Sequence, residues 1–218
     1  MNPTLHLALV AACAALSCSA HAAAVPVASY DTPNGNGQAS GGSFNYWDKN
    51  YTGSGATTTD GAPLTGGLGD LTDGVIATAN WNLVENAAGT GPYVGYLNID
   101  PTVTFHFAAP TSFGSATFYF DVSNFGGVAQ PASIDVNTLS FVLPTYAGNA
   151  PRSFTANLSS LAPTDMLAVT FHRSNAWVFV SEAQFATAAV TAVPEPSSHA
   201  LMLAGLAGLA VLAKRRKG

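Results

Sequence analysis

The 218-residue sequence has almost no cysteine and little charge. Its two cysteines, Cys13 and Cys18, both lie near the N-terminus, and charged residues make up only 9% of the chain. The long remainder of the chain therefore has no thiol that could form a disulfide or act as a nucleophile.

Basic residues are scarcer still in the central part of the chain. Between Val25 and Val193, eleven acids face only three bases, Lys49, Arg152 and Arg173, so this region carries about eight net negative charges. Such a surface repels a phosphate backbone, and we expect no nucleic-acid partner.

The familiar catalytic motifs are also missing. The sequence has no His-x-His, His-Glu-x-x-His or Gly-x-Ser-x-Gly. His106 and His172 each fall in a strand pattern, where a cross-strand or surface role is expected rather than metal binding. We therefore expect that the protein is not an enzyme. A glycoside hydrolase that uses two of the acids is the less favoured alternative.

The N-terminal segment has the pattern of a secretory signal peptide. Leu5–Leu16 is almost wholly apolar, and Ala20-His21-Ala22 and Ala22-Ala23-Ala24 both fit the small-x-small cleavage pattern. We predict a signal peptide over residues 1–23, with the Sec export machinery as partner. Cys13 ends a sequence similar to a lipid-attachment box, but only twelve residues precede it.

The C-terminal segment has three consecutive parts. Val193–Pro196 is a stiff Val-Pro-Glu-Pro sequence, Ala200–Ala213 is an unbroken apolar run of 14 residues, and Lys214–Lys217 is basic. As a helix the run spans about 21 Å, less than the ~30 Å hydrocarbon core of a bilayer. A terminal helix packed on a domain is the alternative, but such a helix would normally have a polar face.

This order of parts resembles the PEP-CTERM sorting signal of exported proteins in Gram-negative bacteria. The resemblance implies transient anchoring in the inner membrane, cleavage by an exosortase, and a final place at the cell surface or in the extracellular matrix. The implied processing motif and basic stop are Val193, Pro194, Glu195 and Pro196, and Lys214, Arg215, Arg216 and Lys217.

Alternating apolar and polar residues predict an all-β domain between the two signals. Thr102–Phe107 places Val103, Phe105 and Phe107 on one face, and Ser115–Val122 alternates in the same way, with Phe118 and Phe120 opposite Thr117 and Tyr119. Other predicted strands are Ser43–Trp47, Tyr93–Ile99, Ser133–Val142, Phe154–Leu158, Leu167–His172 and Ala176–Phe185. The fold class is a two-sheet antiparallel β-sandwich.

The predicted domain boundaries follow from these segments. A flexible lead-in covers residues 24–42, the sandwich 43–187, a linker with the Pro-Glu-Pro motif 188–198, and the hydrophobic helix with its basic tail 199–218. Residues 53–69, rich in Gly and Thr, are predicted to be irregular.

Within the domain, the turn Leu71–Gly74, the nearby Trp81 and the closing strand Trp177–Phe185 resemble the discoidin-like (galactose-binding-like) jelly roll. The resemblance covers roughly residues 40–187 and implies a structural Ca²⁺ ion. Its implied ligands are the side chains of Asp73, Thr78 and Glu182 and the carbonyls of Asp70 and Ser181. The alternative is that Asp73 and Gly74 only form a turn.

Jelly rolls of this kind bind glycans through loops at one end. Tyr146, Asn149 and Arg152 are the candidate ligand-binding residues, because an aromatic ring, an amide and a guanidinium together suit a sugar. We expect an exopolysaccharide or another surface glycan as the ligand. A structural matrix or surface protein without a soluble ligand is the alternative.

Overall fold

Most of the predicted strands form, and they lie in two antiparallel sheets in the computed structural model, which describes residues 22–37, 39–189, 205–206 and 215. Ala22–Ala189 make up one compact unit. Its two helices are single turns, α1 (Ala39–Gly42) and α2 (Trp81–Val84).

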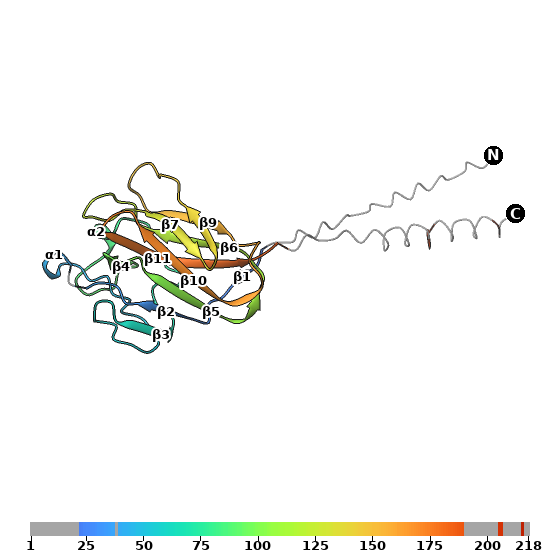
Figure 1. Ribbon diagram of the computed structural model, residues 1–218, viewed down its shortest axis with the longest axis horizontal. Helices are drawn as coiled ribbons and strands as arrows, with labels where there is room; N and C mark the ends of the chain where they lie inside the picture. Colours follow the sequence, from blue (N-terminus) through green and yellow to red (C-terminus); the bar gives the residue numbers. More distant parts are fainter. Residues whose placement is uncertain (1–21, 38, 190–204, 207–214, 216–218) are drawn as a thin grey trace, which may run out of the picture. The chain divides into compact units, whose positions relative to one another are not determined.

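The five-stranded sheet is built around β11 (Figure 1). β6 pairs with one side of β11, and β9 pairs with the far side of β6. On the other side of β11, β4 pairs with its first part, Trp177–Val180, and β1 pairs near its end, at Phe185 and Ala186. Its strands are β1 (Ala24–Val25), β4 (Val94–Leu97), β6 (Phe113–Phe120), β9 (Arg152–Asn157) and β11 (Trp177–Thr187).

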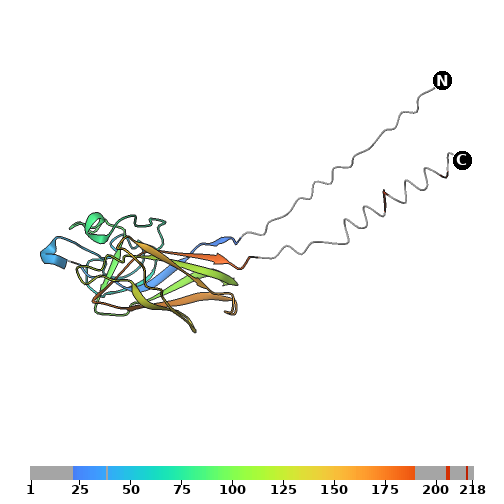
Figure 2. The same cartoon turned by 90° about the horizontal axis from the view of Figure 1, so that it is seen from above.

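The six-stranded sheet has the order β3-β2-β5-β10-β7-β8, and Figure 2 shows the domain from above. Its strands are β2 (Ser29–Pro33), β3 (Pro63–Gly67), β5 (Thr102–Thr111), β7 (Pro131–Val136), β8 (Leu139–Val142) and β10 (Thr164–Arg173). β7 and β8 form a tight hairpin in which Asn137 adopts φ 51°, a left-handed conformation that Asn tolerates.

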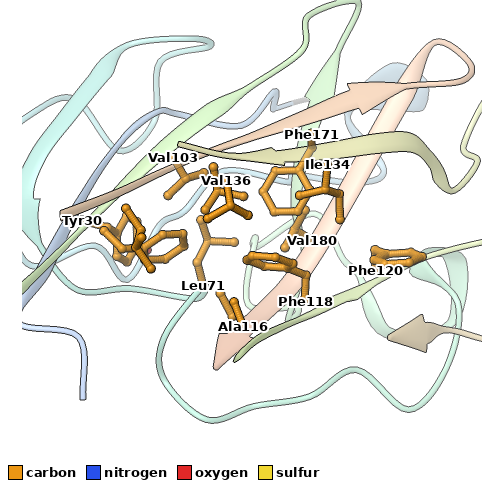
Figure 3. Close-up of a cluster of buried hydrophobic side chains, with 14 of the residues drawn as sticks. Tyr30, Leu71, Val103, Ala116, Phe118, Phe120, Ile134, Val136, Phe171 and Val180 are labelled. Carbon is orange, nitrogen blue, oxygen red and sulfur yellow. The ribbon is translucent and has the colours of Figure 1, made fainter. Parts of the chain in front are cut away.

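The core lies between the sheets and is rich in phenylalanine (Figure 3). Phe118 of β6 meets Phe171 of β10 edge-to-face at 5.4 Å, and Phe105 of β5 lies 4.9 Å from Phe185 of β11. The predicted inward residues of β5 and β6 are buried, which confirms the alternation.

β11 changes the face that it presents to the core part-way along its length. A bulge between Val180 and Glu182 means that Val178 and Val180 face the core first, followed by Ala183 and Phe185. Glu182 is thereby turned to the outer face. Before the bulge, Phe179 is also buried on that outer face, under a second cluster that includes Tyr46, Trp81 and Tyr93.

The structure differs from the predicted boundaries at the N-terminal side. The lead-in 24–42 contains β1, β2 and α1, whereas Ser43–Trp47 forms no strand. Tyr30 of β2 is fully buried and its hydroxyl binds Asp48, so core packing, rather than local propensity, orders this segment. Residues 53–69, predicted to be irregular, contain β3.

At the other end, β11 continues to Thr187, and the Ala188 N–H donates to the Ser112 carbonyl at 3.2 Å. The predicted signal peptide and apolar run lie almost entirely outside the described residues. In the C-terminal segment, Gly205, Leu206 and Arg215 are described, and all three are helical. Within the described parts of the chain, we find no helix with the length and apolar character needed to cross a membrane.

Candidate functional site

The loop Leu71–Ala77 fills a gap in the edge of the five-stranded sheet. β4 pairs with β11 at Trp177–Val180 and β1 pairs only with Phe185 and Ala186. Between these two pairings, the Leu71 carbonyl accepts a hydrogen bond from Ala183 N–H at 2.9 Å. The loop therefore takes the place of a missing strand beside the bulge.

Side chains of β11 hold the rest of this loop. Gly74 N–H donates to Glu182 Oε2 at 3.1 Å, and Ala77 N–H donates to Ser181 Oγ at 3.4 Å. Asp73 Oδ1 accepts from Val75 N–H at 2.8 Å, and Gly74 has φ +83°. The Asp-Gly turn predicted from the sequence is confirmed.

Several carboxyl groups gather behind this loop. Burial raises the pKa of Asp70 to about 7, with a further contribution from Asp48. Burial also raises the pKa of Glu182 to about 7, although the Gly74 N–H stabilises its carboxylate. Asp73 repels the charged forms of Asp48, Asp70 and Glu182, so each of these three groups lies within electrostatic range of Asp73.

Asp70 has an unsatisfied oxygen. The residue is 2% exposed, and its Oδ1 accepts from Asn50 Nδ2 at 3.0 Å. Its Oδ2 is buried without a hydrogen-bond partner. A buried carboxylate oxygen of this kind is costly, and a cation would satisfy it.

The predicted calcium ligands are only partly brought together. Asp70, Asp73 and Thr78 line one pocket of about 290 Å³. Glu182 lines a different groove of about 540 Å³, although Gly74 links it to the same loop. Among the described residues, no three His, Cys, Asp or Glu side chains converge as a metal-binding group. The oxygen donors suit Ca²⁺ in type, and hydroxyl and carbonyl oxygens would have to complete its coordination.

The predicted glycan rim lies beside β9. The Tyr146 ring packs 5.9 Å from Phe120, and its hydroxyl donates to the Ser153 carbonyl at 3.0 Å. Arg152 Nη2 donates to the Ala147 carbonyl at 2.7 Å, which closes the loop that carries the exposed Asn149. Tyr146 and Asn149 lie in the loop before β9 and Arg152 is the first residue of β9, so the three residues lie near one another, but the Tyr146 ring is only partly accessible.

Tyr119 is an additional aromatic residue next to this rim, and it was not among the sequence candidates. It lines a pocket of about 340 Å³ together with Arg152 and Ile76, and its hydroxyl donates to Gln184 Oε1 at 3.2 Å. The alternation in β6, which turns Tyr119 outward between Phe118 and Phe120, was the sequence signal that could have identified it as a surface aromatic residue. Four other tyrosines, by contrast, are buried and cannot contact a ligand, namely Tyr46, Tyr51, Tyr93 and Tyr96.

Both histidines of the domain bridge strands on the outer face of the six-stranded sheet. His106 Nε2 lies 2.8 Å from Asp31 of β2. His172 Nε2 lies 2.7 Å from Asp135 of β7, and its Nδ1 lies 3.3 Å from Asp100. The hydrogen bond to Asp135 is the main reason that the pKa of His172 is raised. The predicted cross-strand role is confirmed.

Comparison with known proteins adds two findings. An X-ray structure of GH31 CBM32-2 bound to GalNAc is similar to this chain at 16% sequence identity and a TM-score of 0.33, over 63% of this chain and 91% of that one. That likeness is too low to assign a site or a ligand here. A search of curated proteins gave no match.

The second finding concerns the C-terminal segment, where the resemblance noted in the sequence is borne out. Residues 192–217 match the model of the PEP-CTERM protein-sorting motif. This motif indicates export, transit in a membrane-anchored form and processing by an exosortase. The chain is therefore a β-sandwich that carries a PEP-CTERM sorting motif at its C-terminal side.

Proposed function

We propose that this protein is exported, held briefly in the inner membrane, and cut by an exosortase near Pro194-Glu195-Pro196. The β-sandwich is then released or attached at the cell surface or in the extracellular matrix. The observation that carries the proposal is the sorting motif at residues 192–217. The basic residues Lys214–Lys217 act as the cytoplasmic stop.

The motif follows closely on the folded unit. Ala188 is hydrogen-bonded to Ser112, and five residues separate it from Pro194. Each proline fixes its own φ and biases the preceding residue toward extended conformations. An extended segment fits a protease cleft at a low cost in conformational entropy.

Replacing Pro194, Glu195 and Pro196 together by alanine tests the sorting proposal. We expect the variant to remain uncut in the membrane fraction, while the parent protein reaches the surface or the medium in a shorter form. Intact mass spectrometry and cell fractionation measure both outcomes. Replacing Ser197 and Ser198 by alanine is the matched control, because these residues directly follow the Pro-Glu-Pro sequence and leave its prolines in place. Processing of the triple-alanine variant at the parental rate would refute the proposal.

We also propose that the released sandwich binds a surface glycan or exopolysaccharide. Support comes from Arg152 at the start of β9, which is hydrogen-bonded to the loop that carries Asn149 and Tyr146, with the Tyr119 ring and a pocket of about 340 Å³ beside it. Aromatic rings pack against sugar faces, and guanidinium and amide groups bond sugar hydroxyls.

A glycan array probed with the processed protein tests this binding function. We expect Arg152→Ala to weaken binding by roughly tenfold or more, because it removes a charged hydrogen-bond donor. Arg173→Ala is the matched control, since Arg173 lies in another pocket and pairs with Asp100. Absence of binding to every glycan would instead favour a structural matrix protein.

We also propose that Ca²⁺ binds at the loop Asp70–Thr78. The orphaned Asp70 Oδ2 and the repulsion among the surrounding carboxyl groups support this assignment. The side chains of Asp73, Thr78 and Glu182 and the carbonyls of Asp70 and Ser181 are the proposed ligands. A bound Ca²⁺ would neutralise these like charges and hold the loop against β11.

A further inference from the structure

The hydrogen-bonded ladder of β1 begins one residue before the strand itself. Ala24 pairs with Ala186 and Val25 with Phe185. Thr187 N–H donates to the Ala23 carbonyl at 2.9 Å, and Ala23 N–H donates to Thr187 Oγ1 at 3.1 Å. The folded domain thus makes use of both backbone groups of Ala23.

The same segment contributes to the sandwich beyond these bonds. Val25 and Val27 pack against the main core, and Ala28 N–H donates to the His106 carbonyl at 2.8 Å. β1 also covers the edge of β11 that would otherwise be open at Phe185 and Ala186. Losing the first residues of this segment would expose that edge.

The two small-x-small sequences place the cut on different sides of Ala23. A cut after Ala22 leaves Ala23 as the first residue and keeps the whole ladder. A cut after Ala24 removes Ala23 and Ala24, and it places the new ammonium group on Val25, which is half-buried and paired with Phe185. Burying part of a charged group in this way opposes folding.

We propose that the export protease hydrolyses the Ala22–Ala23 peptide bond, one residue before the end of the signal peptide predicted over residues 1–23, so that the mature protein begins at Ala23. Water adds across the amide, which leaves a carboxyl group on Ala22 and an amino group on Ala23. Ala23 is exposed, so its ammonium group remains hydrated while it donates to Thr187 Oγ1. The inference rests on the proposed export and defines the first residue of its product.

Variants at the two sites separate the alternatives. Ala20→Asp alters the first small-x-small sequence only, and Ala24→Asp alters the second only. We expect the parent protein and the Ala24→Asp variant to begin at Ala23 by intact mass spectrometry, and the Ala20→Asp variant to begin at Val25 or to remain uncut. An exported parent protein that begins at Val25 overturns the inference but not export. A parent chain that stays uncut in the cytoplasm overturns both.

The stability of the exported products gives a second readout. The Ala23 product should melt roughly 5 °C above a Val25 product, because it retains the hydrogen bonds of the ladder. Thr187→Val removes the acceptor of the Ala23 ammonium, so it should lower the Tm of the Ala23 product and leave that of the Val25 product unchanged. Equal effects on both products would show that Ala23 does not make this contact.

Discussion

At the scale of single residues, the carboxylates around the loop Asp70–Thr78 are the least satisfied groups that the structure describes at the candidate site. Asp70 has an unpartnered buried oxygen, and Glu85 Oε2 is also buried without a partner. Asp73 accepts the Val75 N–H of its own turn through Oδ1. Besides burial, the charges of Asp48 and Asp73 raise the pKa of Asp70, and that of Asp70 raises the pKa of Glu85; a divalent cation would offset this repulsion.

Calcium should therefore stabilise the processed protein. At a concentration about 100 times its Kd, Ca²⁺ would add about 2.7 kcal/mol, or roughly 5–10 °C in Tm. Asp73→Asn and Glu182→Gln should each abolish the rise, whereas Asp165→Asn, an exposed change on the other sheet, should not. Differential scanning calorimetry with Ca²⁺ and with EDTA measures the effect. Identical melting in both solutions would leave Asp73 with its turn role alone.

At the scale of elements, alternation predicted strands well where one face is buried and the other is polar. β5 and β6 follow this rule, since Phe105 and Phe118 face the core while Thr104 and Thr117 face outward. The rule failed for β2, where the order depends on distant contacts. The Tyr30 hydroxyl binds Asp48, and the Tyr51 hydroxyl binds the Tyr30 carbonyl. These contacts join residues about 20 positions apart, so no local pattern in the sequence could predict them.

β11 shows the same limit in a strand that was predicted correctly. Near its apolar start, Val178–Val180 is buried on both faces because a second aromatic cluster covers the outer side of the sheet. The bulge after Val180 then determines which face receives Glu182. The candidate calcium site depends on that bulge, since strict alternation from Val178 and Val180 would turn Glu182 into the core.

At the scale of the whole molecule, the domain is acidic, and several of its acids are buried. Burial raises the pKa of Asp70 from 3.8 to about 7 and that of Glu85 from 4.5 to about 8. A carboxyl group with a raised pKa binds more protons when the protein is folded than when it is unfolded. The free energy of unfolding therefore falls as pH rises from the unfolded pKa toward the folded one.

We expect stability without divalent cations to fall between pH 5 and pH 8, by on the order of a few kcal/mol. His172 acts in the same direction, because its raised pKa means that its ion pairs are lost as pH rises through the folded value. Urea unfolding in EDTA at several pH values measures the slope. The double variant Asp70→Asn, Glu85→Gln should flatten it, while Asp165→Asn should not. A slope of the opposite sign in the parent protein would contradict this account.

The sequence alone determined the sorting motif, because three local features in a fixed order carry it and none depends on distant contacts. It also determined the β-sandwich class and the inward faces of β5 and β6, which follow from alternation. Only the tertiary structure decided that the folded unit includes β1 and β2, that Glu182 faces outward and that Tyr46, Tyr51, Tyr93 and Tyr96 are buried. Those outcomes depend on pairing across the fold, where an edge, a bulge or a second hydrophobic layer overrides what a local pattern can encode.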